Sequence, residues 1–468
     1  MTHIAVVLYD GVAALEVAGA CEVLGRMPGC HLSTVGGTLA EVAAGGGSLR
    51  LVPTHDFKTA PRPAVVVVPG CVDTLPGALA DEALLAWLRE ACGGARWVVG
   101  VSEGAVLLAA AGVLEGRRAT THWSAREALA RYGVAAVDEP TVTDGPVVTA
   151  AGASGAVEAA LLVVAEVGGE ELARRIQLLI EYDPDLAPPE ATHRGADRQT
   201  LDGTPRGAQG APGEEAPPLH IALLVYEGIT AMDILGPYDV LWRLPGARVE
   251  FVAREAGVLR SDTGALQLVA SRPFREVPRP DVIVVPAANF TVAEVVRHEP
   301  TLAWLRSAHG STRYTTSVCG GSLILAEAGV LQGLRATSHW LVLGLLRDRG
   351  AEPVMARYVA QGRVLTAAGV SAGVDMALQL AGVLGGAEVS ARIRLALQYE
   401  PAPPSDAGAI RSAPAERVRR TAGMLLVNRD LPRALRVTPV GAALAFSWRL
   451  LRHRLSAGRA WIPGRPTG

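Results

Sequence analysis

Short runs of apolar residues alternate along this chain with longer segments whose apolar residues recur at helical spacing. Two β-rich openings and two continuous apolar runs are typical of parallel strands buried on both faces; they lie at 3–11, 220–228, 64–70 and 281–287. The spacing predicts helices at 81–92 and 301–309. This alternation predicts an α/β, three-layer fold with parallel sheets, whose reactive groups lie beyond the carboxyl ends of the strands.

This pattern of strands and helices occurs twice along the chain. The same residues return 217 positions later at every anchor: Tyr9 and Tyr226, Pro69 and Pro286, Trp87 and Trp304, Tyr182 and Tyr399. One register held over this length is typical of an internal duplication. We therefore expect two homologous domains of about 185 residues, each large enough to bury its own core.

The sequence outside the copies has a different composition. We place the domains at 1–187 and 218–405, because residues 188–217 are rich in Pro, Gly and charge and predict a flexible linker. The last segment, 406–468, carries twelve arginines against three acidic residues. We expect it to be a solvated, arginine-rich tail.

Composition and charge narrow the class of protein. A net charge of −2 excludes a polyanion-binding field over the whole chain. Five cysteines without a C-x-x-C pair exclude a disulfide scaffold and a cysteine-rich zinc site. The chain has no run of 18 apolar residues, and it opens without the basic region of a signal peptide, so we expect a cytoplasmic protein with no membrane span.

The candidate chemistry lies at a strand-to-helix turn of the second copy. Cys319 follows a strand-like segment and precedes Gly320, Gly321 and a helix-like segment. Such a turn exposes a side chain in a strained backbone conformation, and the helix start would lower the pKa of a thiol. The two glycines would let the backbone approach a substrate closely. The alternative is a buried, inert cysteine.

The first copy places Ser102 at the matching position, within a G-x-S-x-G pattern. A serine nucleophile needs base and acid partners that this short motif does not supply. We favour a site that has lost its cysteine over a working serine nucleophile.

An acidic residue lies near the opening strand of each copy. Asp233 stands in an otherwise apolar segment, and Glu16 takes its place in the first copy. Burial would raise the pKa of such a carboxyl, which could then donate or relay a proton to a nearby thiol. A helix N-cap explains an aspartate here equally well.

His122 and His339 each follow the turn residue by twenty positions, and each precedes a tryptophan. Either histidine could be a base that reaches the turn or a residue packed beside the tryptophan; we favour a supporting role. We find no His, Cys and Asp grouping with metal spacing and no phosphate-binding glycine loop, so we expect neither a metal nor an organic cofactor.

These motifs, taken in order, resemble the ThiJ/PfpI superfamily, whose members are class I glutamine amidotransferase-like proteins. Within it, the second copy resembles the isonitrile hydratases and the sensor domains of AraC-type transcription regulators. The resemblance runs from Leu219 to about Arg420 and rests on four segments, at 233–241, 316–319, 328–340 and 398–404. The first copy shares the outline more weakly.

The resemblance implies a flavodoxin-like domain in each copy, with Cys319 as the nucleophile and Asp233 as its acid partner. An isonitrile hydratase adds water to an isonitrile, a small-molecule substrate, and gives an N-substituted formamide. Family members commonly pair as dimers, so the tandem chain could form an intramolecular pseudo-dimer or a homo-oligomer.

The chain departs from the family pattern at several positions. The family hydratases usually have Thr where this chain has Gly320, and a Pro-Gly-Gly loop where it has Pro286, Ala287 and Ala288. Backbone N–H groups can form an oxyanion site with alanine only where the backbone torsions suit a Cβ. The first copy lacks the cysteine, so we expect at most one active domain, with the first copy structural or regulatory.

Two other classes of function remain open. One is a non-catalytic sensor pair related to AraC-type regulators; the tail is too short for a paired helix-turn-helix module, so we do not expect DNA as a partner. The other is a glyoxalase-like or hydrolase activity on small carbonyl compounds at the same Cys319.

Overall fold

A computed structural model of the chain describes residues 2–183, 218–288, 291–401, 403–405, 407–408 and 413–427. The predicted linker at 188–217 and residues 428–468 of the predicted tail lie outside this part of the chain.

Each copy contains one seven-stranded sheet. The strands of the first sheet are β1 (Thr2–Val7), β2 (Cys30–Gly36), β5 (His55–Asp56), β6 (Val65–Val68), β7 (Trp97–Val101), β10 (Thr141–Asp144) and β11 (Val147–Ala150). Those of the second are β12 (Leu219–Leu224), β13 (Ala247–Ala253), β16 (Arg272–Pro273), β17 (Val282–Val285), β18 (Tyr314–Val318), β21 (Tyr358–Gln361) and β22 (Val364–Ala367). The strand orders, β10-β11-β7-β6-β1-β2-β5 and β21-β22-β18-β17-β12-β13-β16, are equivalent, as an internal duplication requires.

The prediction of parallel sheets is wrong at one edge of each sheet. The edge strands β10 and β21 run antiparallel to β11 and β22, whereas the other neighbouring strands are parallel. Only two residues connect each edge pair, and Gly145 and Gly362 open these connections with a φ of 60°. A connection this short joins only antiparallel strands.

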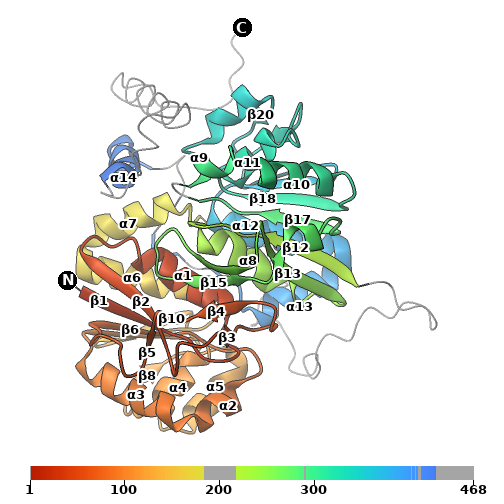
Figure 1. The fold of residues 1–468 in the computed structure, drawn as a ribbon. Coiled ribbons are helices and arrows are strands. Elements are labelled where there is room, and N and C mark those ends of the chain that lie inside the picture. Colours follow the sequence, from red (N-terminus) through yellow and green to blue (C-terminus); the bar gives the residue numbers. More distant parts are fainter. Residues whose placement is uncertain are drawn as a thin grey trace.

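Helices cover both faces of each sheet (Figure 1). The helices of the first copy are α1 (Ala14–Leu24), α2 (Leu75–Ala80), α3 (Glu82–Gly94), α4 (Gly104–Ala110), α5 (Arg126–Ala130), α6 (Gly155–Gly168) and α7 (Glu170–Leu179). Those of the second are α8 (Ala231–Leu241), α9 (Val292–Val295), α10 (Glu299–His309), α11 (Gly321–Glu327), α12 (Val370–Gly385) and α13 (Ala387–Ala396). The helices expected at 81–92 and 301–309 are confirmed as α3 and α10, and Asp81 caps α3 by accepting a 3.0 Å hydrogen bond from the Leu84 N–H.

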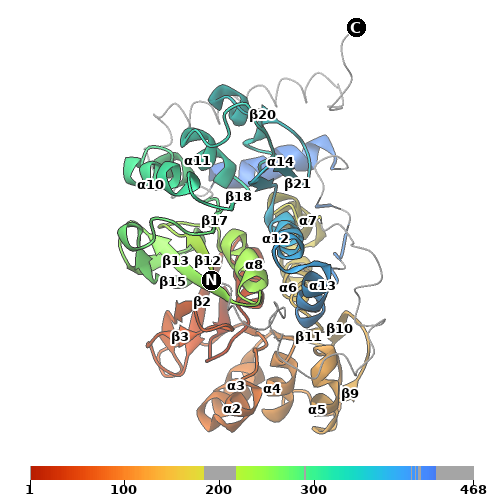
Figure 2. The ribbon, with the colours of Figure 1, turned by 90° about the vertical axis from the view of Figure 1, so that its right-hand side faces the viewer.

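The two copies pack against each other through their inner helices. Figure 2 shows α6, α7, α8, α12 and α13 between the two sheets, with α2, α3 and α4 on the outer side of the first and α10 and α11 on the outer side of the second. Every residue of α1 and of α8 is buried, because each helix lies between its own sheet and the other copy.

A small sheet also joins the copies. Strand β4 (Arg50–Val52) pairs antiparallel with β15 (Gln267–Ala270), and Leu51 lies opposite Leu268. These two leucines are 217 positions apart, so equivalent residues of the two copies meet here. The two copies are thus related by an approximate two-fold arrangement at this point.

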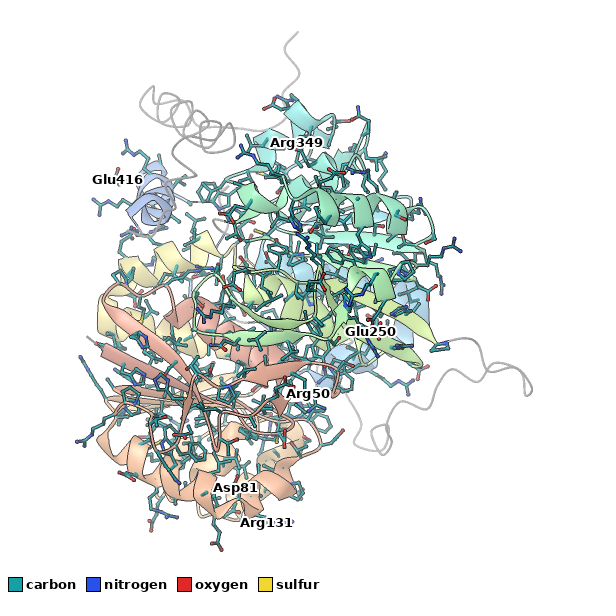
Figure 3. All side chains as sticks on the ribbon, in the orientation of Figure 1. Arg50, Asp81, Arg131, Glu250, Arg349 and Glu416 are labelled. Carbon is teal, nitrogen blue, oxygen red and sulfur yellow. The ribbon has the colours of Figure 1, made fainter. Side chains whose placement is uncertain are left out.

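Part of the predicted tail is helical. Helix α14 (Ala415–Val427) contacts α7, and the Arg175 guanidinium donates a 3.0 Å hydrogen bond to the Arg420 carbonyl. Glu416, labelled in Figure 3, lies on α14 and accepts a 2.8 Å hydrogen bond from Arg420. No helix in the described part of the chain has both the length and the hydropathy to cross a membrane.

Candidate functional site

Cys319 occupies a sharp turn between β18 and α11. Its φ is 57°, and Ser102, the equivalent residue between β7 and α4, has a φ of 47°. Left-handed torsions cost a residue with a Cβ about 1–3 kcal/mol, so both turns are strained as expected. The strain is held by hydrogen bonds to the turn's backbone: the Cys319 N–H donates to the Ala367 carbonyl at 3.0 Å.

The residue directly before His339 or His122 holds the backbone carbonyl of the turn residue in its own copy. The Ser338 hydroxyl donates a 3.0 Å hydrogen bond to the Cys319 carbonyl, and Thr121 makes the same bond to Ser102 at 2.6 Å. The hydroxyl group that precedes each histidine therefore supports the strand-to-helix turn, here called the elbow, in both copies.

The acid of each copy lies on the helix that follows the opening strand. Asp233 is fully buried on α8, and its Oδ2 accepts a 3.2 Å hydrogen bond from the Ala287 N–H. Its Oδ1 has no hydrogen-bond partner among the described residues. Burial raises the pKa of this carboxyl well above its usual range, and the Glu22 carboxyl raises it further, so the site favours the protonated form of Asp233.

The loop after β17 presents its backbone to this acid. Ala287 and Ala288 are both buried, and neither belongs to the residues with positive φ, so their torsions suit a side chain with a Cβ. Two alanines can thus stand where the family pattern has two glycines.

The two glycines after Cys319 have different roles. Gly320 has an ordinary helical φ of −67°, and a Cβ added there would meet the Ala287 Cβ at 3.4 Å, which is normal contact. A Cβ on Gly321 would lie 2.2 Å from the Val285 carbonyl oxygen. Gly321 is therefore required for the close approach of α11 to the end of β17, and Gly320 is not required by the fold.

The expected lowering of the Cys319 pKa is wrong. Burial raises the pKa of this thiol well above its usual value, the carboxyls of Asp233, Glu181 and Glu22 raise it further, and the Gly320 N–H opposes them. Helix α11 has only seven residues, so its dipole is small beside these effects. Cys319 is held as a thiol, with the Asp233 carboxyl among the groups that oppose its ionisation.

His339 connects the two copies. Its Nε2 donates a 2.9 Å hydrogen bond to the Leu179 carbonyl of the first copy, and its Nδ1 accepts one of 3.3 Å from the Leu341 N–H. Burial lowers its pKa to about 4, so the ring is neutral at pH 7. Both ring nitrogens are engaged in these bonds, which leaves His339 supporting the site rather than acting as a base at Cys319.

The first copy arranges its equivalent residues differently. The Ser102 hydroxyl donates a 2.6 Å hydrogen bond to Glu16 Oε1, and the Gly70 N–H donates another of 2.6 Å to Glu16 Oε2. Burial and Glu103 raise the pKa of Glu16 to about 8. His122 Nδ1 lies 2.6 Å from the Ser124 hydroxyl and 3.6 Å from Glu103, not at the hydroxyl of Ser102.

A pocket of about 630 Å³ opens at this first-copy site. It is lined by Ser102, Glu16 and Cys71 of the first copy and by residues of α8, α13 and the turn that follows α8 in the second. Cys71 stands where the second copy has Ala288, and burial raises the pKa of its thiol to about 12.

The site around Cys319 also contains residues of the first copy, which the sequence did not indicate. Arg26, two residues beyond the end of α1, pairs with Glu22 of that helix and, at 3.3 Å, with Asp262 of the second copy. Glu181, just beyond α7, lies 3.9 Å from His339. One signal was available: Glu181 precedes the repeated Tyr182, and its equivalent is the uncharged Gln398.

Among the residues that the structure describes, no three side chains of His, Cys, Asp or Glu are grouped so that they could hold a metal ion. The chemistry that the arrangement can perform is thiol addition assisted by a buried acid.

Comparison with known proteins identifies the family. The model of the DJ-1/PfpI family matches residues 2–166 and 219–382. The chain therefore belongs to the DJ-1/PfpI family and carries its domain twice, which confirms the resemblance seen in the sequence.

Three relatives illustrate the range of the family. The isonitrile hydratase of Pseudomonas putida is 43% identical over 196 residues, which are 42% of this chain and 85% of that protein. The HTH-type transcriptional regulator CdhR of Pseudomonas aeruginosa is 35% identical over 96 residues, 20% of this chain and 29% of the regulator. Among solved structures, a ThiJ/PfpI family protein from Pseudomonas syringae is 33% identical, with 52% of this chain and 97% of that chain covered and a TM-score of 0.44.

Proposed function

We propose that the second copy is a hydratase of the isonitrile hydratase type, with Cys319 as nucleophile and Asp233 as proton donor. The observation that carries the proposal is the state of this pair: Cys319 is held as a thiol, and Asp233 is a buried acid with one oxygen unpartnered among the described residues. The likeness to the isonitrile hydratase of Pseudomonas putida supports the same chemistry.

This pair suits an isonitrile because the terminal carbon of that group must accept both a nucleophile and a proton. The Cys319 sulfur forms a bond to the carbon while Asp233 gives its proton to the same carbon, and the thiol proton returns to Asp233. The product of this step is a thioimidate, R–N=CH–S–Cys319.

Water completes the reaction. Its oxygen adds to the thioimidate carbon and a proton goes to the nitrogen, giving R–NH–CH(OH)–S–Cys319. The carbon–sulfur bond then breaks, the hydroxyl proton goes to sulfur, and the formamide R–NH–CHO leaves. The Ala287 N–H donates to Asp233 Oδ2, and this bond holds the acid in place for its proton transfers.

The direct test is to incubate the full chain with n-butyl isonitrile and, separately, with methylglyoxal. We expect N-butylformamide from the first and no lactate from the second. Lactate without formamide would replace the proposal with a glyoxalase-like activity at the same cysteine.

A second candidate is a non-catalytic sensor, and the likeness to CdhR favours it. That likeness covers 29% of the regulator. Sequence-specific, salt-dependent DNA binding in a gel-shift assay, together with no turnover of either substrate, would favour this function over the hydratase.

A further inference from the structure

The end of α7, in the first copy, lies against the Cys319 site of the second. The Val370 N–H donates a 3.3 Å hydrogen bond to the Ile180 carbonyl, and the Trp340 indole N–H donates one of 3.4 Å to the Leu178 carbonyl. A Cβ on Gly369 would lie 2.2 Å from the Glu181 Cβ. The second copy thus has a glycine where Glu181 passes closest.

The Glu181 side chain enters this site as an acid. Its exposed fraction is 14%, and its Oε2 lies 3.9 Å from His339 Nε2 without a hydrogen-bond partner among the described residues. Its φ of 49° is left-handed, a conformation that the surrounding contacts between the copies must hold.

Four groups face this carboxyl from the neighbouring elements. The Trp340 backbone N–H donates a hydrogen bond to it, the Arg357 guanidinium attracts its charge, and the Asp183 carboxyl repels it. The fourth, His339, is neutral at pH 7. Burial outweighs the favourable partners and raises the pKa of Glu181 to about 8.

The first-copy site receives the equivalent residue of the second copy. The Trp123 N–H donates a 3.0 Å hydrogen bond to Gln398 Oε1, and Gln398 has a φ of 43°. The geometry is therefore reciprocal, but the chemistry is not. The serine site receives an amide, which cannot ionise, and the cysteine site receives a carboxyl, which can.

We propose that Glu181, supplied by the first copy, is a positioning residue of the Cys319 site: its carboxyl enters beside His339 and Gly369 and places a negative charge near the sulfur. Glu181 acts on the sulfur electrostatically and need not touch the substrate. The first copy, which has lost the cysteine, thereby completes the site of the second. The effect on the thiol is independent of any substrate, and only its catalytic consequence rests on the proposed hydratase function.

The test is the pH dependence of Cys319 alkylation by iodoacetamide in the full chain, read by mass spectrometry of the peptide that contains Cys319. Glu181→Gln creates the side chain that the other site already accommodates. We expect its alkylation midpoint to move to lower pH; a midpoint lower by about one pH unit makes the reaction at pH 9 roughly tenfold faster. Gln398→Glu is the matched control and should leave the Cys319 profile unchanged.

A purely structural role for Glu181 has a different signature. If Glu181→Gln merely loosened the site, alkylation would accelerate equally at every pH and the midpoint would stay where it is. That result, or an unchanged profile, overturns the inference even if the wild type hydrates isonitriles. A lower midpoint in a protein that hydrates no isonitrile would sustain the inference and defeat the proposed function.

Discussion

The hydroxyl of Ser102 donates a 2.6 Å hydrogen bond to the carboxyl of Glu16. The equivalent acid, Asp233, is one methylene shorter, and its Oδ1 has no hydrogen-bond partner among the described residues. In the first copy the acid is therefore hydrogen-bonded to the elbow residue, whereas in the second copy one oxygen of the acid makes no such bond to the thiol residue.

Replacement of Asp233 by Asn should slow formamide production at least about 100-fold, because the amide cannot supply the proton that the isonitrile carbon needs. The measurement is kcat/KM with n-butyl isonitrile. Glu16→Gln is the matched change in the first copy and should alter kcat/KM less than about twofold. An Asp233→Asn variant that stays folded and retains full activity would remove Asp233 from the mechanism.

Gly320→Thr should fold normally and raise the hydration rate several-fold. The backbone at Gly320 is already helical, and the added Cβ meets Ala287 at an ordinary 3.4 Å. The new hydroxyl would stand where the family hydratases usually carry one. A slower enzyme with an unchanged Tm would show that Gly320 is itself needed for the reaction.

Gly321→Ala should instead destabilise the protein by about 1–3 kcal/mol, since its Cβ would lie 2.2 Å from the Val285 carbonyl oxygen. Urea unfolding measures this cost. Equal stabilities of Gly321→Ala and wild type would contradict the close approach of α11 to β17.

Arg26→Met should cost about 3–5 kcal/mol in the free energy of unfolding. Arg26 compensates the buried acids Glu22 and Asp262 across the contact between the copies, and its loss leaves them without this cation. The control is Arg275→Met, which removes an exposed ion pair to Glu255 and should change stability by less than about 1 kcal/mol. Similar costs for the two variants would argue against a buried network between the copies.

Thermal stability should fall as the pH rises from about 4.5 to about 8. Folding raises the pKa of Glu16 from 4.5 to about 8, so the folded state keeps a proton that the unfolded chain releases. Its contribution is complete below pH 4.5 and is lost as the pH rises through 8. Glu16→Gln should make the decline in Tm shallower by a few °C. An identical slope in both proteins would place the Glu16 pKa near its ordinary value.

Much of this molecule can be predicted from its sequence. The offset of 217 residues predicts two equivalent domains, and the strand-to-helix turns predict the places of Cys319 and Ser102. The antiparallel edge strands are indicated only by two short connections that contain Gly145 and Gly362. The turns and the short connections each depend on residues that are close together in the chain, so a local pattern can encode them, although the prediction of parallel sheets overlooked the two connections.

The environment of Cys319 was not predictable in the same way. Its half-buried thiol lies near several carboxyls, two of which, Glu22 and Glu181, come from the other copy. Such contacts arise only when α1, α7 and α8 pack across the two domains, and no local pattern encodes them. The helix start predicted a lowered pKa and a thiolate, but the tertiary contacts raise the pKa and favour the thiol.

In the proposed function, one of two equivalent elbows carries out the chemistry. The most direct test is formamide production from n-butyl isonitrile by Cys319→Ala and Ser102→Ala, each checked by Tm for normal folding. We expect no formamide from Cys319→Ala and a wild-type rate from Ser102→Ala. Loss of activity in Ser102→Ala with full activity in Cys319→Ala would contradict the assignment.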